Sequence, residues 1–247
     1  MKYRIDNIGN GTWLIEEYDK NMSVYMYLLE GKEKALLIDT GFGTIPLKEI
    51  CKTLTNKPIM VILTHGHADH IGGSGQFEEV WLKREDEKLY QLHAKEEIRR
   101  IFTKEPLFPV NEQLHYFEGD ITIPLGERDI QTISVPGHSV GSICLLDKNN
   151  RLLYTGDTCC KAHVLLQLDY AAPLKEFRKS IQKLIGISTQ FDATWPSHHK
   201  KPVEKEILKD FLVVSDAILS GQIQGKIVEL PMGKARLVEY KEIGIEY

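Results

Sequence analysis

The sequence predicts an α/β protein in which two β-rich halves form a sandwich of two sheets covered by helices. β-Prone runs dominate residues 12–39 and again residues 121–154. Apolar residues recur at helical spacing over residues 174–185 and 203–220, which predicts amphipathic helices. No linker or low-complexity segment interrupts the 247 residues, and this length suits one large α/β domain. We therefore expect a single domain over residues 1–247.

The first half predicts a series of strands and a helix. Residues 30–33 contain a glycine and predict a hairpin turn. Thr44 is placed to cap a helix that has Pro46 in its first turn and ends near Thr53. Residues 84–103 are highly charged and predict solvated helices. The predicted strands of this half are residues 13–15, 24–29, 35–38 and 59–63.

The second half repeats part of this pattern. Residues 23–39 and 141–157 both contain a strand, a polar turn, a second strand and then Asp-Thr, over the same distance, which suggests a duplicated β-unit. Gly221 is expected to end the later of the two helices. The predicted strands of this half are residues 121–123, 130–135, 143–146, 152–154, 194–196, 227–230 and 236–240.

Residues 64–70, Thr-His-Gly-His-Ala-Asp-His, place three histidines and one aspartate directly after a buried strand. Loops on a rigid scaffold often carry function. His65 and His67 are two residues apart, so an extended backbone points both side chains the same way. Asp69 and His70 follow at a shorter spacing and can face a different point. Imidazole nitrogens and carboxylate oxygens suit zinc, and also iron or manganese, so this loop predicts a metal site.

Composition argues against several classes of protein. The net charge of −4 gives no basic footprint for a nucleic-acid backbone. No apolar run approaches the ~20 residues of a membrane span, and the charged N-terminus is unlike a signal peptide. The four cysteines show no disulfide framework. We expect a cytoplasmic protein with reduced thiols that acts on a small molecule, without nucleic-acid or membrane partners, and a homodimer stays open.

The order His-X-His-X-Asp-His after a buried strand resembles the signature of the metallo-β-lactamase-fold hydrolases. Three further positions match the order of that family, each at a predicted strand end. They are His138 in Pro-Gly-His-Ser, Asp157 in Thr-Gly-Asp-Thr and His198 in Trp-Pro-Ser-His. The resemblance runs from Asp39 to the final strands and implies the four-layer αββα metallo-β-lactamase fold.

This resemblance also implies a dinuclear metal site, with two Zn²⁺ per chain and iron or manganese as alternatives. The first ion would be bound by His65, His67 and His138, the second by Asp69, His70 and His198, and both by Asp157. A hydroxide held between two metals would attack a carbonyl. Asp69 and Asp39 are the expected catalytic residues: Asp69 helps to move the proton, and Asp39 orients a ligand by a hydrogen bond. Thr64 is expected to act like Asp39.

The chain departs from many relatives around the last ligand. These relatives have Pro-Gly-His-Gly there, whereas this chain has Pro-Ser-His-His. Its position after the proline favours His198 as the ligand, and we expect His199 to be solvated. Lys200 and Lys201 can meet an anionic substrate, although a solvated loop is favoured. Cys159 and Cys160 follow the predicted bridging aspartate, and for them burial is favoured over approach to a pocket.

The leading hypothesis for the reaction is hydrolysis of a thioester, as in glyoxalase-II-like enzymes, because the motifs around His138 and Asp157 resemble that branch. Aspartate at position 157 argues against the β-lactamases that use a cysteine ligand there. The second hypothesis is a lactonase of the acyl-homoserine-lactone type. Those enzymes usually have a tyrosine three residues after the bridging aspartate, where this chain has Cys160, although Tyr170 can approach from elsewhere.

A third hypothesis, from another class, is a persulfide dioxygenase that holds one iron in the first triad alone. Metal analysis distinguishes it from a dinuclear hydrolase. A phosphodiesterase or RNA-processing enzyme is disfavoured by the acidic charge balance. A non-catalytic binding protein is the weakest hypothesis, because all seven ligand positions are present.

Overall fold

The computed structural model describes residues 2–199, 201–230 and 233–247. The chain divides into two compact units, residues 1–132 and 133–247, and each unit has its own sheet and helices. Among the residues that the structure describes, no helix is long and apolar enough to cross a bilayer. The expected single domain stays a prediction.

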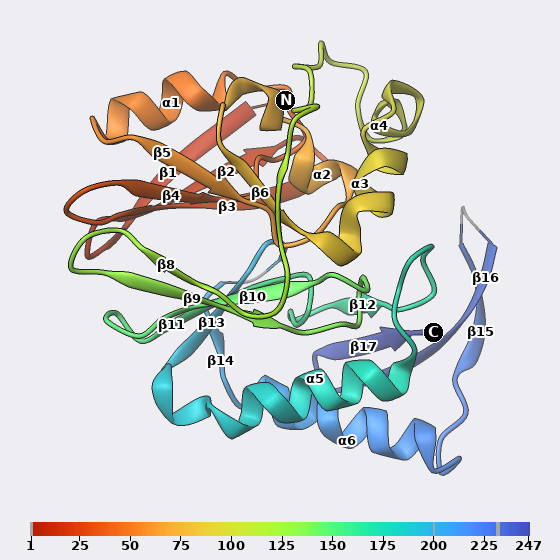
Figure 1. Cartoon of the computed structure of the whole chain (residues 1–247). Helices are drawn as coiled ribbons and strands as arrows, with labels where there is room; N and C mark the ends of the chain where they lie inside the picture. The colour runs from red at the N-terminus through yellow and green to blue at the C-terminus, as the bar shows by residue number, and fades with distance from the viewer. Residues whose placement is uncertain (1, 200, 231–232) are drawn as a thin grey trace. The chain divides into compact units, whose positions relative to one another are not determined.

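Unit 1 is built on a seven-stranded sheet in the order β1-β2-β3-β4-β5-β6-β7 (Figure 1). Strands β1 to β4 pair antiparallel, whereas β4 to β7 pair parallel. The sequence predicted β2 to β5 but missed β1, which is polar and largely exposed, and the short β6 and β7. The strands are β1 (Lys2–Gly9), β2 (Thr12–Tyr18), β3 (Ser23–Glu30), β4 (Ala35–Ile38), β5 (Ile59–Ile62), β6 (Val80–Lys83) and β7 (His115–Phe117).

Helix α1 crosses one face of this sheet (Figure 1). It begins directly after Pro46, which makes no side-chain capping hydrogen bond. The prediction that Thr44 caps this helix is wrong, because the Thr44 hydroxyl donates instead to the Glu17 carboxyl group. The helices of unit 1 are α1 (Leu47–Leu54), α2 (Ala68–Ile71), α3 (Glu87–His93) and α4 (Glu96–Phe102), with short 3₁₀ turns η1 (Ser74–Gln76) and η2 (Arg84–Asp86).

The charged residues 84–103 form helices as predicted, but two of their side chains are not solvated. Asp86 is fully buried and Arg99 nearly so. The Arg99 guanidinium donates to the backbone C=O of Gly72 and of Phe108, each at 2.8 Å. A charged side chain is buried only where partners replace its water, so Arg99 ties α4 to the backbone just after α2.

Unit 2 contains two sheets. The larger has the order β14-β13-β11-β10-β9-β8, in which β8 and the first residues of β9 precede the unit boundary. The smaller has the order β12-β17-β16-β15. β12, β14 and β17 were not predicted. The helix expected over residues 203–220 begins only at Ile207, because residues 203–204 pair with β13 as the strand β14. The strands are β8 (Thr122–Pro124), β9 (Asp129–Ser134), β10 (Ile143–Asp147), β11 (Leu152–Gly156), β12 (His163–Leu165), β13 (Ala193–Pro196), β14 (Val203–Glu204), β15 (Lys226–Leu230), β16 (Gly233–Tyr240) and β17 (Ile243–Glu246).

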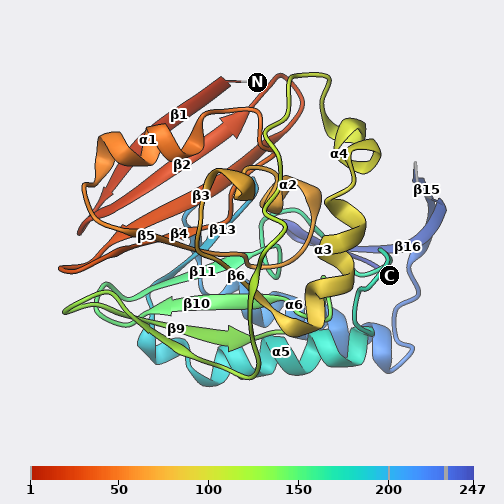
Figure 2. The same cartoon turned by 45° about the horizontal axis from the view of Figure 1, so that its top comes forward.

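The helices α5 (Leu174–Gly186) and α6 (Ile207–Leu219) run side by side in unit 2 (Figures 1 and 2). Their contact includes Phe177 and Phe211, whose ring centroids lie 5.8 Å apart at 87°. Gly221 follows α6 with a left-handed φ of 74°, which is the backbone that glycine adopts without strain, so the predicted end of this helix is confirmed. A 3₁₀ turn, η3 (Ser188–Gln190), follows α5.

Each unit contains an antiparallel hairpin followed at once by an aspartate. In unit 1, β3 and β4 pair antiparallel and Asp39 follows. In unit 2, β10 and β11 pair antiparallel and Asp157 follows. The repeated sequence pattern thus corresponds to the same local structure in both units, and in both it places a carboxylate at a strand end.

Candidate metal centre

The predicted metal ligands His65, His67, Asp69 and His70 form the half-site of unit 1. It is organised around the carboxylate of Asp39. β4 and β5 are parallel neighbours, so their carboxyl ends meet at the same edge and place Asp39 beside Thr64. Asp39 is fully buried. Its Oδ1 accepts the Thr64 backbone N–H at 2.7 Å, and its Oδ2 accepts the Thr64 hydroxyl at 2.8 Å. These contacts join the ends of the two strands.

Asp39 also orients His70. The Nδ1 of His70 lies 2.8 Å from Asp39 Oδ2, and because a carboxylate only accepts, the His70 Nδ1–H donates. His70 Nε2 is then the unprotonated nitrogen, and it lies 3.8 Å from Asp69 Oδ2. Both residues belong to α2, which begins at Ala68, so a helical turn gives Asp69 and His70 their direction.

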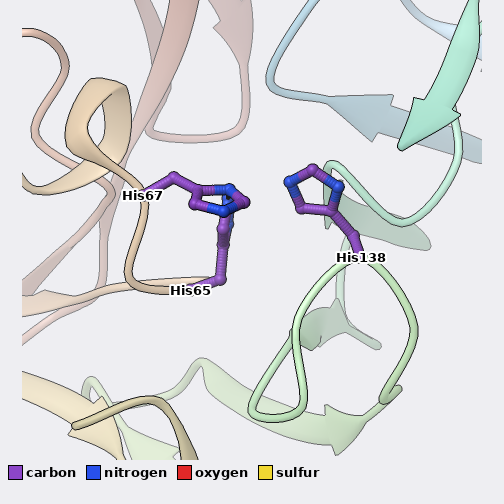
Figure 3. Close-up of side chains that lie close together, drawn as sticks. All are labelled: His65, His67 and His138. Atoms are coloured by element: carbon purple, nitrogen blue, oxygen red, sulfur yellow. Dashed lines mark hydrogen bonds between the residues drawn. The ribbon is translucent and has the colours of Figure 1, made fainter. Parts of the chain in front are cut away.

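Thr64 orients the ring of His65 in a similar way, through a hydrogen bond. Its hydroxyl donates to Asp39 and lies 3.0 Å from His65 Nδ1, so it accepts from His65 Nδ1–H. His65 Nε2 is then unprotonated and faces His67 Nδ1 at 3.0 Å. Figure 3 shows both rings on the loop that follows β5. These two nitrogens lie close enough together to bind one metal ion.

Three further residues hold this half-site, and sequence reasoning missed all of them. Asp86 Oδ2 accepts the Gly66 N–H at 2.9 Å. His93 Nδ1 accepts the Ala68 N–H at 3.1 Å. Glu17 is buried in β2 and accepts from the backbone N–H groups of Phe42 and Thr44, at 2.8 and 2.9 Å. No local motif marks these side chains, since their partners lie 20 or more residues away.

Glu17 holds the loop after Asp39 through hydrogen bonds to its backbone. Burial raises the pKa of the Glu17 carboxyl, while hydrogen bonds from Thr44, Phe42 and Gly43 act to lower it. The approach is close: a Cβ on Gly41 would come 2.2 Å from Glu17 Oε2, and Gly41 has a φ of 69°. Glycine is therefore required where this loop passes the carboxyl group.

The predicted ligands His138, Asp157 and His198 form the half-site of unit 2. His138 lies on a turn after β9 (Figure 3). Its Nδ1 lies 3.0 Å from the Leu165 C=O. A carbonyl only accepts, so Nδ1 donates and His138 Nε2 is the unprotonated nitrogen. The turn is braced by Ser142, whose Oγ accepts the Ser139 N–H at 2.9 Å, and by the Ala172 N–H, which donates to the Gly137 C=O at 2.8 Å.

Asp157 lies near two histidines of unit 2 that the sequence predicts as metal ligands, His138 and His198. Its Oδ2 is 3.5 Å from His138 Nε2 and 3.5 Å from His198 Nε2. β11 and β13 are parallel neighbours, and the Ser197 N–H donates to the Gly156 C=O at 3.0 Å. This pairing brings the ends of both strands together and places the predicted ligands Asp157 and His198 side by side.

The remaining predicted residues of unit 2 fall into two groups. Cys159 and Cys160 are buried in the hydrophobic core, as favoured from the sequence, and burial raises the pKa of Cys159 to about 12. His199 is exposed, as expected, and has a left-handed φ of 65°. Tyr170 is also exposed and its C=O accepts the Val140 N–H, next to the His138 turn. Lys200 lies outside the described residues.

The donor atoms of each unit are of types that bind divalent metals. Zinc binds imidazole and carboxylate at ~2.0–2.2 Å, so neighbouring donors of a tetrahedral site lie about 3.3–3.6 Å apart. The two separations within unit 2, both 3.5 Å, fall in this range, and those within unit 1, 3.0 and 3.8 Å, lie just outside it. Imidazole and carboxylate together suit zinc, iron or manganese. The hydrogen bonds to Asp39, Thr64 and the Leu165 C=O leave one defined ligand nitrogen on His70, His65 and His138 respectively.

Comparison with known proteins points to one superfamily. A model of the metallo-beta-lactamase superfamily matches residues 20–186 of the chain. The chain is 29% identical over 217 residues to acyl-coenzyme A thioesterase MBLAC2 of Homo sapiens, covering 75% of this chain and 76% of that protein. It is 25% identical over 186 residues to a hydroxyacylglutathione hydrolase of Francisella tularensis, covering 75% of this chain and 66% of the hydrolase.

Solved structures support the same conclusion for the fold. A metallo-beta-lactamase from Pontibacter korlensis matches with a TM-score of 0.64 and 21% identity, over 87% of this chain and 99% of that chain. An identity this low shows the fold alone. Together with the mixed α/β structure of both units, it confirms the fold class that the sequence predicted.

Proposed function

Because the chain belongs to the metallo-β-lactamase superfamily of metal-dependent hydrolases, we propose that it hydrolyses an acyl thioester. Two similar proteins support this substrate class. One is named an acyl-coenzyme A thioesterase and the other a hydroxyacylglutathione hydrolase, and both names describe cleavage of the bond between an acyl carbon and a sulfur. The proposed substrate is therefore a small thioester, with the thiol of a carrier such as coenzyme A or glutathione as the leaving group.

The proposed site combines the half-sites of the two units. In this proposal the units form one domain, and two zinc ions are held by the ligand sets that the family order implies. The first set is His65, His67 and His138, the second is Asp69, His70 and His198, and Asp157 belongs to both. The observation that carries the proposal is the buried hydrogen-bonded chain from His70 through Asp39 and Thr64 to His65, which sets a ligand nitrogen on each ring.

Bound metal ions supply activated water at neutral pH and polarise a carbonyl oxygen. The residues of the chain orient the metal ligands and move the proton. Asp39 keeps His70 in one tautomer, and Thr64 does so for His65. Asp69, whose side chain is 17% exposed, takes the proton from water and delivers it to the departing thiolate. In the balanced reaction the water oxygen bonds to the acyl carbon and the carbon–sulfur bond breaks. One proton of the water goes to the thiolate, the other is released to solvent, and the thiol and carboxylate leave.

The proposal includes a cytoplasmic location and a small-molecule substrate, without a nucleic-acid or membrane partner. All four cysteines are free and buried, which is usual for proteins from a reducing compartment. The net charge of −4 is unfavourable for contacts to a phosphate backbone. A homodimer is compatible with this function and is not needed for it, because each chain carries all the proposed ligands.

The test is turnover of S-lactoylglutathione and of a short series of acyl-coenzyme A thioesters by zinc-loaded protein, with Asp157→Ala as the paired variant. We expect hydrolysis of at least one thioester, and a loss of about 10³-fold in the variant, which corresponds to several kcal/mol of metal-dependent stabilisation. Metal content is measured on both proteins. Activity on lactones alone, or oxidation of persulfides by a form with one iron, would instead support the second or third hypothesis and contradict the thioester proposal.

A further inference from the structure

The loop of residues 65–68 packs directly on the backbone of the segment 86–93, which comprises the end of η2 and all of α3. A Cβ on Gly66 would come 2.8 Å from the backbone N of Tyr90 and 3.2 Å from the backbone O of Asp86. Only glycine allows this approach. The segment thus lies directly against the ligand loop at Gly66.

Two side chains of this segment hold the loop through its peptide groups. Asp86 Oδ2 accepts the Gly66 N–H at 2.9 Å, and His93 Nδ1 accepts the Ala68 N–H at 3.1 Å. The first of these peptide groups follows His65 and the second follows His67. Each of the two histidines is therefore followed by a peptide whose orientation is fixed by an acceptor from the 86–93 segment.

His93 also restricts the orientation of the His67 ring. The two ring centroids lie 4.8 Å apart at an interplanar angle of 46°. Because the Ala68 N–H donates to Nδ1, that nitrogen is unprotonated, which fixes which edge of the His93 ring faces the loop. The orientation of His67 is thus restricted from two sides, by its following peptide and by the adjacent ring.

We propose that Asp86 and His93 are positioning residues that hold His65 and His67 in metal-binding geometry before a metal arrives. This inference rests on the proposed function in taking these two histidines as ligands. Asp86 and His93 act through the loop and are not ligands themselves. Residues of this kind raise metal affinity by holding the ligands in the orientation that binds metal. Their loss typically weakens metal binding by about 10–100-fold.

The test separates the two contributions of His93. His93→Phe keeps a ring beside His67 but removes the acceptor, whereas His93→Asn keeps an acceptor near the place of Nδ1 but removes the ring. We expect His93→Phe and Asp86→Ala to weaken zinc binding about 10–100-fold. His93→Asn should bind zinc more tightly than His93→Phe, because it keeps the acceptor, but less tightly than the wild type, because it loses the ring. The readouts are competition with a chromophoric chelator and the visible spectrum of the Co²⁺-loaded protein, both independent of turnover.

Matched controls lie in the same unit. His115 is an exposed histidine stacked on Trp81, and Asp19 is a carboxylate that accepts the N–H groups of Asn21 and Met22 in a turn. His115→Phe and Asp19→Ala should leave zinc affinity unchanged, although Asp19→Ala lowers stability. If Asp86→Ala does not fold, the His93 pair decides the question.

The inference is overturned if His93→Phe binds zinc as tightly as the wild type, or if His93→Asn loses as much affinity as His93→Phe. The proposed function fails in a different way. A wild-type protein that binds zinc and loses affinity in His93→Phe, but hydrolyses no thioester, would remove the proposed substrate and leave the positioning role standing. A wild-type protein that binds no metal would remove both.

Discussion

In unit 1 the predicted ligands come from one loop of six residues, His65 to His70, whereas in unit 2 each comes from a different strand end. The loop of unit 1 is held by side chains from distant positions: Asp39, Asp86 and His93 each contact it. The ring of His138 in unit 2 is held by a backbone carbonyl, that of Leu165. Side-chain substitutions around the ligands should therefore damage unit 1 more than unit 2.

Among the residues that support the predicted ligands, the largest expected effect is at Asp39. Asp39→Ala removes the acceptor of three hydrogen bonds and leaves the buried Thr64 N–H unsatisfied, which costs about 1–3 kcal/mol of unfolding free energy. Loss of the fixed His70 tautomer should lower kcat/KM about 10–100-fold. Denaturant titration and steady-state kinetics measure the two effects. Glu49→Ala, which removes only an exposed contact to Lys52, is the control. Wild-type activity in Asp39→Ala would contradict the role of this carboxylate.

A smaller effect on activity is expected at Ser142 in unit 2. Ser142→Ala removes the acceptor of the Ser139 N–H and should cost about 1–3 kcal/mol of unfolding free energy. The Leu165 C=O still holds His138, so kcat/KM should fall by less than the loss in Asp39→Ala. The same two measurements decide it. An equal or larger loss of activity in Ser142→Ala would break the contrast between the two units.

The mildest effect concerns pH and Glu17. Its folded-state pKa is raised above 4.5 by burial, so the folded protein holds a proton that the unfolded chain releases. The resulting stability is present below pH 4.5 and is lost as the pH rises through the folded-state pKa. Glu17→Gln cannot ionise. The unfolding free energy of the wild type minus that of Glu17→Gln should fall with rising pH, as followed by denaturant titration, and a flat difference would count against this account.

The same contrast explains what could be predicted from the sequence. The loop of unit 1 was found because its ligands are adjacent in the chain, and spacing alone indicates metal binding. His138, Asp157 and His198 are isolated residues, and they became ligand candidates only through the order of a known family. Their assembly with unit 1 in one site stays a proposal.

The supporting residues were missed for a physical reason. Asp86 and Arg99 lie in a strongly charged stretch, and charge density predicted solvation, whereas both are buried by contacts with backbone groups 9 to 27 residues away. Glu17 lies in a strand that was predicted correctly, but nothing in the local pattern shows that its carboxyl group braces the loop after Asp39. Long-range hydrogen bonds of this kind leave no periodic signal.

Asp39 itself is restricted in two independent ways. Its backbone has a left-handed φ of 62°, which among residues with side chains is tolerated best by asparagine and aspartate. Its carboxylate must also reach both Thr64 and His70. Glycine would satisfy the backbone but not the hydrogen bonds, and glutamate carries the acceptor on a side chain that is longer and less suited to this backbone. In a saturation library at position 39, aspartate should therefore be almost the only residue that preserves folding and activity, with asparagine the best-tolerated substitution. This position should tolerate very little sequence change.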